Sequence, residues 1–158
     1  MHSNLKFFNK SKTLPTDIFF KNVLYNKSFG YYSTKLPFGK NGDFITAPKI
    51  SKLFSEMISI WLVSTWERFG KPKNLNIIEL GPGDGSLMKI LIEFLKNFPE
   101  SNNSINLYLY EKSNFLKKIQ KKNIIRKKIR WINSFKQIKK GPVIFFGNEF
   151  FDAIPIKQ

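Results

Sequence analysis

Three closely spaced glycines follow a short apolar segment in the middle of the chain. The segment "IIELGPGDG" contains a G-x-G-x-G pattern formed by Gly81, Gly83 and Gly85. Glu79 stands two residues before the first of them. Glycines in a strand-to-helix turn let the backbone adopt positive φ and come close to a ligand, and the first amides of the following helix then point at that ligand. The pattern therefore predicts a ligand-binding turn.

The spacing favours S-adenosyl-L-methionine over a dinucleotide. The dinucleotide fingerprint, G-x-G-x-x-G, requires a glycine where this chain has Ser86. S-adenosyl-L-methionine carries a sulfonium and an ammonium and no phosphate, so Glu79 and Asp84 attract it, whereas they would repel a pyrophosphate. Glu111 ends the second predicted strand, where an acid can accept hydrogen bonds from both ribose hydroxyls. A solvated strand end is the alternative interpretation of Glu111.

Alternating strands and helices must position these residues. From residue 75 onward, apolar runs typical of strands alternate with runs of helical periodicity. The predicted strands span 75–80, 105–111, 128–132 and 142–147, and the predicted helices span 86–98 and 113–122. Such a succession requires parallel strands with right-handed crossovers. We therefore expect an α/β fold, a Rossmann-like doubly wound parallel sheet that binds its ligand beyond the carboxyl ends of its strands.

Helices are also predicted before the sheet. Segment 13–26 is typical of a short helix capped by Thr13 or Thr16, and Ser113 is the expected cap of the later helix. A longer helix is predicted at about 49–69, with an apolar stripe that we expect to face the core: Ile50, Leu53, Phe54, Met57, Ile58, Trp61, Leu62, Trp66 and Phe69. We divide the chain into an N-terminal helical segment, residues 1–70, and a partial Rossmann-like domain that binds the cofactor, residues 71–158.

Acids are scarce and are expected where a cation would bind. The chain has 27 lysines and arginines against 11 aspartates and glutamates, a net charge of +16. The expected topology brings several of these acids to one edge of the sheet: Asp43, Glu79, Asp84, Glu111, Glu149 and Asp152. This placement supports a positively charged ligand.

Composition excludes several other functions. The chain has no cysteine and a single histidine, His2, which excludes disulfides, thiolate metal sites and histidine catalysis, so we predict no metal site. Its apolar runs are too short for a membrane span, and its start resembles neither a signal peptide nor a good transit peptide. Residues 112–140 are basic, but their lysines alternate with apolar residues as on a solvated helix, which disfavours nucleic-acid binding.

Four motifs together resemble the MidA family of class I methyltransferases. They are "GYY", "GDFITAPKIS", "ELGPGDGSL" and "NEFFDAIPIKQ", and the resemblance extends from about residue 14 to the end of the chain. Mitochondrial members of that family are protein arginine methyltransferases that assist assembly of respiratory complex I. The resemblance implies methyl transfer from S-adenosyl-L-methionine to an arginine of a complex I subunit on the quinone-reducing arm.

The resemblance also implies roles for the cofactor-side residues. The three glycines would form the cofactor turn, Glu79 would approach the methionine moiety, and Glu111 would hold the ribose. The loop "GDFITAP" would fold over the cofactor with Asp43, Thr46 and Pro48; a helix-capping turn is the alternative. Lys49, which follows this loop, and Asp84 depart from the residues that the family commonly has there, a glutamate and an arginine.

On the acceptor side, the resemblance points to the residues after the fourth strand. Asn148, Glu149 and Asp152 would lie there. A guanidinium is protonated at physiological pH, which delocalises the lone pair that the reaction needs. Glu149 and Asp152 could orient the guanidinium by a fork of hydrogen bonds and receive its proton. A strand end with a capped turn is the alternative interpretation.

The length of the chain leaves other functions open. The family's sheet has seven strands, ordered 3-2-1-4-5-7-6, and this sequence supplies the first four. We therefore expect a fragment, or self-association through an open sheet edge, with weak cofactor binding and poor methylation. A non-catalytic assembly module and an RNA methyltransferase are the alternatives. We predict a bacterial cytoplasmic protein, or a mitochondrial matrix protein if the source is eukaryotic.

Overall fold

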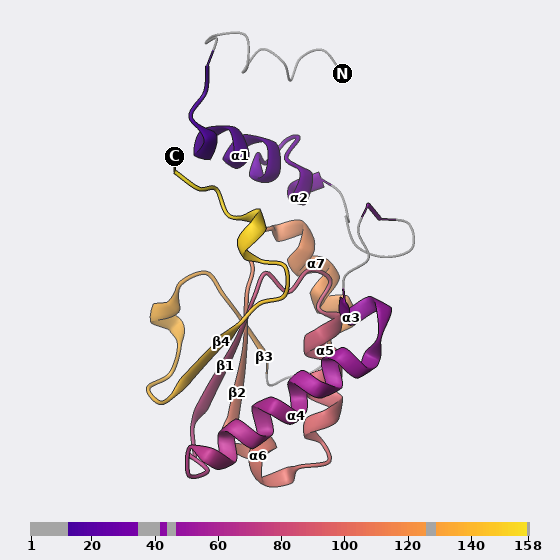
Figure 1. Cartoon of the computed structure of the whole chain (residues 1–158), viewed down its shortest axis with the longest axis vertical. Helices are drawn as coiled ribbons and strands as arrows, with labels where there is room; N and C mark the ends of the chain where they lie inside the picture. The colour runs from indigo at the N-terminus through magenta and orange to yellow at the C-terminus, as the bar shows by residue number, and fades with distance from the viewer. Residues whose placement is uncertain (1–12, 35–41, 44–46, 126–128, 158) are drawn as a thin grey trace.

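A four-stranded parallel sheet forms the centre of the molecule (Figure 1). The structure, a computed structural model, describes residues 13–34, 42–43, 47–125 and 129–157. The strand order is β3-β2-β1-β4, and every neighbouring pair is parallel. The strands are β1 Leu75–Leu80, β2 Ile105–Tyr110, β3 Ile129–Ile132 and β4 Val143–Phe146. The α/β fold, the four strand positions and the first part of the expected strand order are confirmed.

The central strand is buried because it packs between neighbours on both sides. Ile77 of β1 lies opposite Leu107 of β2 and Ile144 of β4 in the ladder. Continuous apolar runs of this kind are typical of strands in parallel sheets. All four strands end at the same edge of the sheet, which we call the carboxyl edge. The register places Glu79 beside Leu109 there.

Helices cover one face of the sheet. The main ones are α4 Lys52–Arg68, α5 Ser86–Leu95 and α7 Asn114–Asn123, with the short α6 Pro99–Ser104 after α5. Figure 1 shows α4, α5 and α7 on the same side of the strands. The core on this side is formed by the inward side chains of β1 and β2 against Leu62, Met88 and Leu91. Ser113 caps α7 as predicted, since its hydroxyl accepts a hydrogen bond from the Leu116 N–H at 3.2 Å.

The other face carries a smaller cluster of Ile78, Tyr108 and Ile132. The connection between β3 and β4, with a single 3-10 turn at Phe135–Gln137, covers part of it. In the described part of the chain, no α-helix lies on this face, so the second helical layer of a doubly wound fold is absent there. β4 is an edge strand, and 47% of Phe145 is exposed on it.

The prediction that the apolar stripe of residues 50–69 faces the core is largely wrong. Leu62 and Trp66 are buried, but the structure exposes these members of the stripe: Ile50, Leu53, Met57, Trp61 and Phe69. The buried face instead includes Ser55 and Ser59. Apolar residues stand on both sides of this helix, which packs against α5, and its buried face combines small serines with apolar residues. Hydrophobic spacing could not choose between the two sides.

Two short helices lie beyond the carboxyl edge of the sheet (Figure 1). They are α1 Thr16–Tyr25 and α2 Tyr31–Thr34, and α3 Ala47–Ile50 follows before α4. The prediction that Thr13 or Thr16 caps α1 is wrong, because Pro15 holds the cap position and no side chain caps the helix. Among the described residues, no helix is long and apolar enough to cross a membrane.

Candidate functional site

The glycine turn connects β1 to α5 in a left-handed backbone conformation. The φ angles of Gly81, Gly83 and Gly85 are 59°, 56° and 83°. Residues with a Cβ adopt such angles at a cost, so this path requires glycine. A Cβ on Gly81 would also lie 2.5 Å from the ring of Phe150. The turn is fastened to the neighbouring strand because the Gly81 N–H donates to the Tyr110 carbonyl at 3.0 Å.

Glu79 is a buried acid directly before this turn. Its side chain is 3% exposed, and its Oε2 has no hydrogen-bond partner among the described residues. Burial raises the pKa of Glu79 to about 8, and the neighbouring Asp84 carboxylate adds to this effect. A buried carboxyl without a partner is costly and is stabilised by a cation placed against it.

Asp84 has a structural role at the start of α5. Its Oδ1 accepts hydrogen bonds from the Ser86 N–H at 3.1 Å and from the Ser86 hydroxyl at 2.6 Å. A carboxylate at a helix N-terminus is favourable because it satisfies a free amide and meets the positive end of the helix dipole. The acidic residue in the turn therefore stabilises the turn itself.

Glu111, just after β2, is held in one orientation. Its Oε1 accepts from the Ser113 N–H at 2.8 Å, and its Oε2 accepts from Gln120 Nε2 at 3.2 Å. Burial raises the pKa of this carboxyl, while the hydrogen bonds from Ser113 and Gln120 act in the opposite direction. A carboxylate has about four acceptor sites, so both oxygens keep capacity for further donors.

Gln120 of α7 is a site residue that sequence reasoning missed. It is fully buried, and its Nε2 also donates to the Gly83 carbonyl at 2.8 Å. One turn further along, Asn123 Nδ2 donates to the Asp84 carbonyl at 3.0 Å. The sequence feature that could have identified Gln120 is its position four residues after the buried Leu116, on the apolar side of an otherwise lysine-rich helix.

Two tyrosines from the N-terminal helices lie over the carboxyl edge. The rings of Tyr25 and Tyr32 are stacked with centroids 5.7 Å apart. The Tyr25 hydroxyl donates to the Ala153 carbonyl at 2.6 Å, and the Ser113 hydroxyl donates to the Tyr32 carbonyl at 2.8 Å. These bonds join α1 and α2 to the segments that follow β4 and β2. The sequence motif "GYY" includes Tyr32, but no role was predicted for it.

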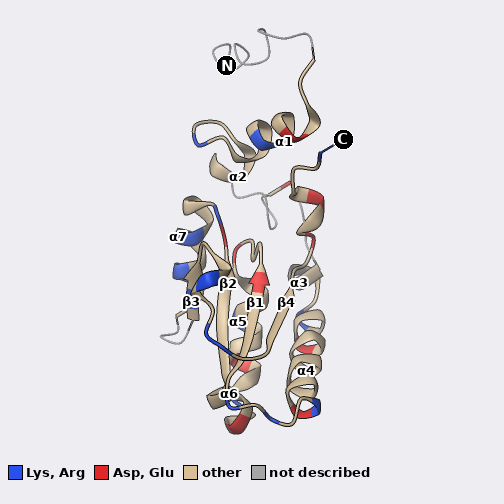
Figure 2. Ribbon diagram, turned by 90° about the vertical axis from the view of Figure 1, so that its left-hand side faces the viewer, with Lys and Arg blue, Asp and Glu red and all other residues tan. Residues whose placement is uncertain are grey.

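Electrostatics show which acids lie near this tyrosine pair. The pKa of the Tyr25 phenol is raised to about 12, chiefly by burial and further by Tyr32, then by the Glu111 and Asp152 carboxylates. Burial also raises the pKa of Tyr32, with contributions from Asp152 and Glu149. The structure therefore brings the acids after β2 and β4 to the same tyrosine pair, and Figure 2 shows acidic segments at this end of the sheet.

The predicted acceptor-side residues form an exposed rim after β4. Glu149 and Asp152 are exposed, and Asp152 lies in the 3-10 turn Phe151–Ala153. Asn148 Nδ2 donates to Glu149 Oε1 at 3.3 Å. Glu149 has a φ of 50°, an uncommon conformation for a residue with a side chain. Such strain is found at functional sites more often than elsewhere.

The predicted covering loop is only partly described. Asp43 is exposed and accepts a hydrogen bond from the Tyr31 hydroxyl at 2.5 Å. Thr46 lies outside the described residues, and Pro48 is described only as part of the α3 backbone. The structure therefore joins Asp43 to α2, and the cofactor-covering role of this loop stays a prediction.

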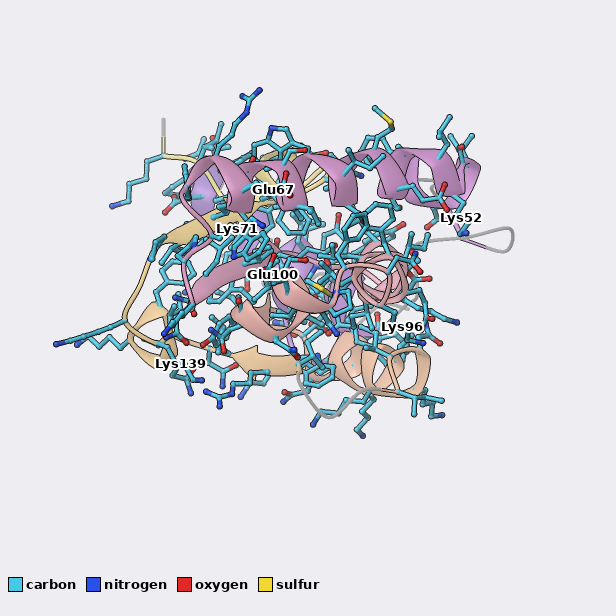
Figure 3. The ribbon with its side chains drawn as sticks, turned by 90° about the horizontal axis from the view of Figure 1, so that it is seen from below. Lys52, Glu67, Lys71, Lys96, Glu100 and Lys139 are labelled. Atoms are coloured by element: carbon cyan, nitrogen blue, oxygen red, sulfur yellow. The ribbon has the colours of Figure 1, made fainter. Side chains whose placement is uncertain are left out.

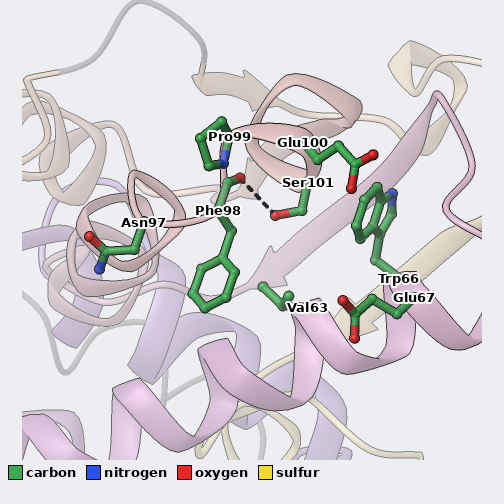
Figure 4. Close-up of a pocket in the computed structure, with 8 residues that line it drawn as sticks. All are labelled: Val63, Trp66, Glu67, Asn97, Phe98, Pro99, Glu100 and Ser101. Atoms are coloured by element: carbon green, nitrogen blue, oxygen red, sulfur yellow. Dashed lines mark hydrogen bonds between the residues drawn. The ribbon is translucent and has the colours of Figure 1, made fainter.

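A cavity of about 210 Å³ lies away from these acids, between α4 and α6 (Figure 4). Its lining comprises Val63, Trp66, Glu67, Asn97, Phe98, Pro99, Glu100 and Ser101. At its edge the ammonium of Lys71 is 2.8 Å from Glu100 Oε2, a surface ion pair whose residues Figure 3 labels. Figure 1 shows α6 and this end of α4 at the opposite end of the sheet from α1 and α2. The described residues contain no acidic or histidine cluster suited to a metal ion.

The fold and the site define a class of protein. A parallel sheet of order 3-2-1-4, with a glycine turn after β1 and an acid after β2, has the architecture of the class I methyltransferases. Residues 57–158 match a family described as "Putative S-adenosyl-L-methionine-dependent methyltransferase". The chain belongs to this family.

Curated relatives and a solved structure agree with this assignment. The chain is 31% identical to the Protein arginine methyltransferase NDUFAF7 homolog, mitochondrial, of Drosophila melanogaster, over 92% of this chain and 38% of that protein. It is 33% identical to the mitochondrial Protein arginine methyltransferase NDUFAF7 of Xenopus tropicalis, over 89% of this chain and 38% of that protein. The chain therefore spans 38% of the length of these relatives.

One solved structure that resembles this chain comes from Burkholderia thailandensis and was crystallised bound to S-adenosyl-homocysteine. It superposes with a TM-score of 0.74 and is 25% identical, covering 90% of this chain and 38% of its own. A second, native crystal structure from the same organism has a TM-score of 0.69 at 23% identity and supports the fold.

Proposed function

We propose that this chain binds S-adenosyl-L-methionine at the glycine turn and serves in methyl transfer to an arginine side chain of a protein. The observation that carries the proposal is Glu79, a buried acid with an unpartnered oxygen beside a left-handed glycine turn. On this proposal residues 71–158 form the cofactor-binding unit, and residues 1–70 supply the segment that covers it.

The residues present fit this cofactor. The positive charges of the cofactor would offset the cost of ionising Glu79 in its buried position. Glu111 has spare acceptor capacity on both oxygens for a pair of ribose hydroxyls. The left-handed glycines contribute no side chains of their own at the turn, so its backbone can approach a ligand closely. These features suit a cationic nucleoside better than a pyrophosphate.

The bound cofactor would supply an electrophilic methyl group, and the residues of the chain would position the acceptor. We propose that Glu149 and Asp152 bind the arginine guanidinium by a fork of hydrogen bonds and localise its charge on the nitrogens far from the reacting one. As the nitrogen–carbon bond forms, the carbon–sulfur bond would break with its electron pair left on sulfur, and one of these carboxylates would receive the proton from the reacting nitrogen. Tyr25 and Tyr32 would exclude water from this end of the sheet.

The proposed acceptor class comes from the relatives and from the motif resemblance. The two relatives compared above are named protein arginine methyltransferases, and both are named mitochondrial. The resemblance to the MidA family adds a complex I subunit on the quinone side as the proposed target. A mitochondrial matrix location is proposed if the source is eukaryotic, and a cytoplasmic one if it is bacterial.

Calorimetry with S-adenosyl-L-homocysteine tests the cofactor part of this proposal. We expect heat of binding for the wild type and binding at least about tenfold weaker for Glu111→Ala, because two ribose hydrogen bonds are lost. Glu100→Ala is the matched control, since it removes an acid at the opposite end of the sheet. Equal affinity for the wild type and Glu111→Ala would contradict the proposal, and no heat at all would leave a non-catalytic assembly module.

A radiolabel assay tests the acceptor. Methyl-labelled S-adenosyl-L-methionine is incubated with the protein and, in separate reactions, with an RNA or with one of two peptides that differ only by Arg or Lys at the acceptor position. We expect label in the arginine peptide and its loss in a Glu149→Gln/Asp152→Asn double variant, since neutral amides cannot take up the proton. Labelling of the lysine peptide or of RNA, with none in the arginine peptide, would exclude the proposed acceptor.

A further inference from the structure

Gln120 joins two parts of the site that lie far apart in the sequence. It is 0% exposed, and its side-chain nitrogen donates both to the Gly83 carbonyl and to Glu111 Oε2, at 2.8 and 3.2 Å. A primary amide nitrogen has two hydrogens, so both are used. The first bond fixes the backbone of the glycine turn, and the second fixes the acid after β2.

Trp131 of β3 determines the orientation of the Gln120 side-chain amide. Its indole Nε1 donates to Gln120 Oε1 at 2.9 Å. An indole nitrogen can only donate, so the amide oxygen must face β3 and the amide nitrogen must face the site. The reversed amide would place two donors together at Trp131 and an oxygen against the Glu111 carboxylate. Both of these contacts would leave buried polar groups without a hydrogen-bond partner.

We propose that Gln120, oriented by Trp131, is a positioning residue that holds the Glu111 carboxylate and the Gly83 backbone at the separation that cofactor binding requires. The inference rests on the proposed function and deepens it. Gln120 acts through its hydrogen bonds to Gly83 and Glu111. Trp131, on strand β3, acts through its hydrogen bond to Gln120. Removing a single N–H on β3 is therefore expected to weaken binding at the glycine turn.

Trp131→Phe is the decisive variant because it deletes the indole N–H and keeps an aromatic ring. We expect this variant to bind S-adenosyl-L-homocysteine about tenfold more weakly by calorimetry, because the amide is no longer held in one orientation. Trp61→Phe is the matched control, since Trp61 is 51% exposed on α4 and should bind like the wild type. Thermal unfolding of both variants separates a loss of affinity from a loss of fold.

Gln120→Glu adds a readout that a purely structural role would not produce. At pH 8 the introduced carboxylate repels Glu111, so we expect binding to be weaker than in the wild type by about a hundredfold. At pH 5.5 the introduced group is protonated and can donate one hydrogen bond, so part of the affinity should return. The affinity of the wild type at pH 5.5 should show no such increase over its own affinity at pH 8.

The other charged and titratable groups around Gln120 and Glu111 are the same in the wild type and in the Gln120→Glu variant. Lys117 of α7 and the Tyr25 phenol of α1 face Glu111. Asp84 follows Gly83 in the turn, with Glu79 close to it. Lys121 lies over the Trp131 ring at 5.6 Å. Because all of these groups are present in both proteins, the difference between the two pH series reports the substituted residue.

The outcomes separate this inference from the function on which it rests. A wild type that gives no heat with S-adenosyl-L-homocysteine overturns the proposed function and the inference with it. A wild type that binds, with Trp131→Phe equal to Trp61→Phe in affinity, overturns the inference alone, whatever the Gln120 variant does. Weak binding by Trp131→Phe, together with recovery of Gln120→Glu at acid pH, supports it.

Discussion

Glu79 is the residue whose ionisation is most strongly coupled to folding in this site. Its pKa is raised from 4.5 to about 8, first by burial and then by Asp84. The folded state therefore binds the Glu79 proton more tightly than the unfolded chain does. This contribution to stability is complete below about pH 4.5 and is lost as the pH rises through about 8.

Replacing Glu79 by glutamine removes this pH dependence. Relative to wild type, Glu79→Gln should gain free energy of unfolding between pH 5 and pH 8.5, by on the order of 3 kcal/mol. Urea denaturation of both proteins across this range measures the difference. Glu56→Gln is the control, because Glu56 forms a surface ion pair with Lys52 and should leave the pH profile unchanged. Parallel profiles for wild type and Glu79→Gln would refute the assignment of a buried, unpartnered acid.

Alanine substitutions at two glycines with similar φ angles distinguish the cost of backbone strain from the cost of steric contact. Gly70 has a φ of 76° and open space where a Cβ would lie, whereas a Cβ on Gly81, at a φ of 59°, would meet the ring of Phe150. Gly70→Ala should cost about 1 kcal/mol, the strain of a left-handed alanine. Gly81→Ala should cost at least about 1 kcal/mol more, because the ring must move. Thermal unfolding measures both, and equal costs would show that Phe150 gives way freely.

Helix α4 contains a buried hydroxyl that the fold does not satisfy. Ser55 Oγ has no hydrogen-bond partner among the described residues, whereas Ser59 Oγ donates to the Ser55 carbonyl at 2.7 Å. Ser55→Ala should therefore stabilise the protein by about 1 kcal/mol, and Ser59→Ala should be neutral or destabilising. Urea unfolding of this matched pair checks the result. Destabilisation by Ser55→Ala would mean that the hydroxyl has a partner in solution.

The same helix shows where sequence patterns reach their limit. The strands could be predicted because each is a short apolar run bounded by turn residues, and such runs suit a buried parallel sheet. A helix over most of residues 49–69 could also be predicted, but the break at Ser51, which separates α3 from α4, could not. The buried face of α4 could not be predicted, because the burial of Ser55 and Ser59 is a tertiary effect that leaves no periodic hydrophobic signal.

At the scale of the whole molecule, an apolar sheet edge is combined with a high positive charge. Phe145 is 47% exposed on the edge strand β4, and the net charge is +16. We expect a second copy to pair at this edge, with self-association that strengthens with salt, because screening reduces the repulsion between copies. Sedimentation velocity at low and high salt measures it.

A pair of charge substitutions identifies the surface responsible. Phe145→Lys should reduce the salt-dependent association, and Trp61→Lys, on the exposed face of α4, should leave it unchanged. Loss of association in Trp61→Lys alone would assign the contact to α4. A wild type that stays monomeric at every salt concentration would remove the expectation altogether.

The topology explains how much of the candidate site could be predicted. Parallel strands end at one edge, so the proximity of the segments after β1, β2 and β4 follows from the strand pattern alone. Gln120 and Tyr25 could not be predicted in the same way, because they reach Gly83 and Ala153 through contacts between distant segments. The position of Glu149 and Asp152 after β4 could be predicted, but the left-handed backbone of Glu149 has no clear sequence signature.

The central claim is that the buried acids at the carboxyl edge receive a cationic nucleoside. A crystal structure of the protein grown with S-adenosyl-L-methionine tests this claim directly. We expect ligand density over the glycine turn, with the ribose hydroxyls on Glu111 and the amino acid end toward Glu79. Density in the cavity between α4 and α6, or a ligand that contacts neither acid, would contradict it.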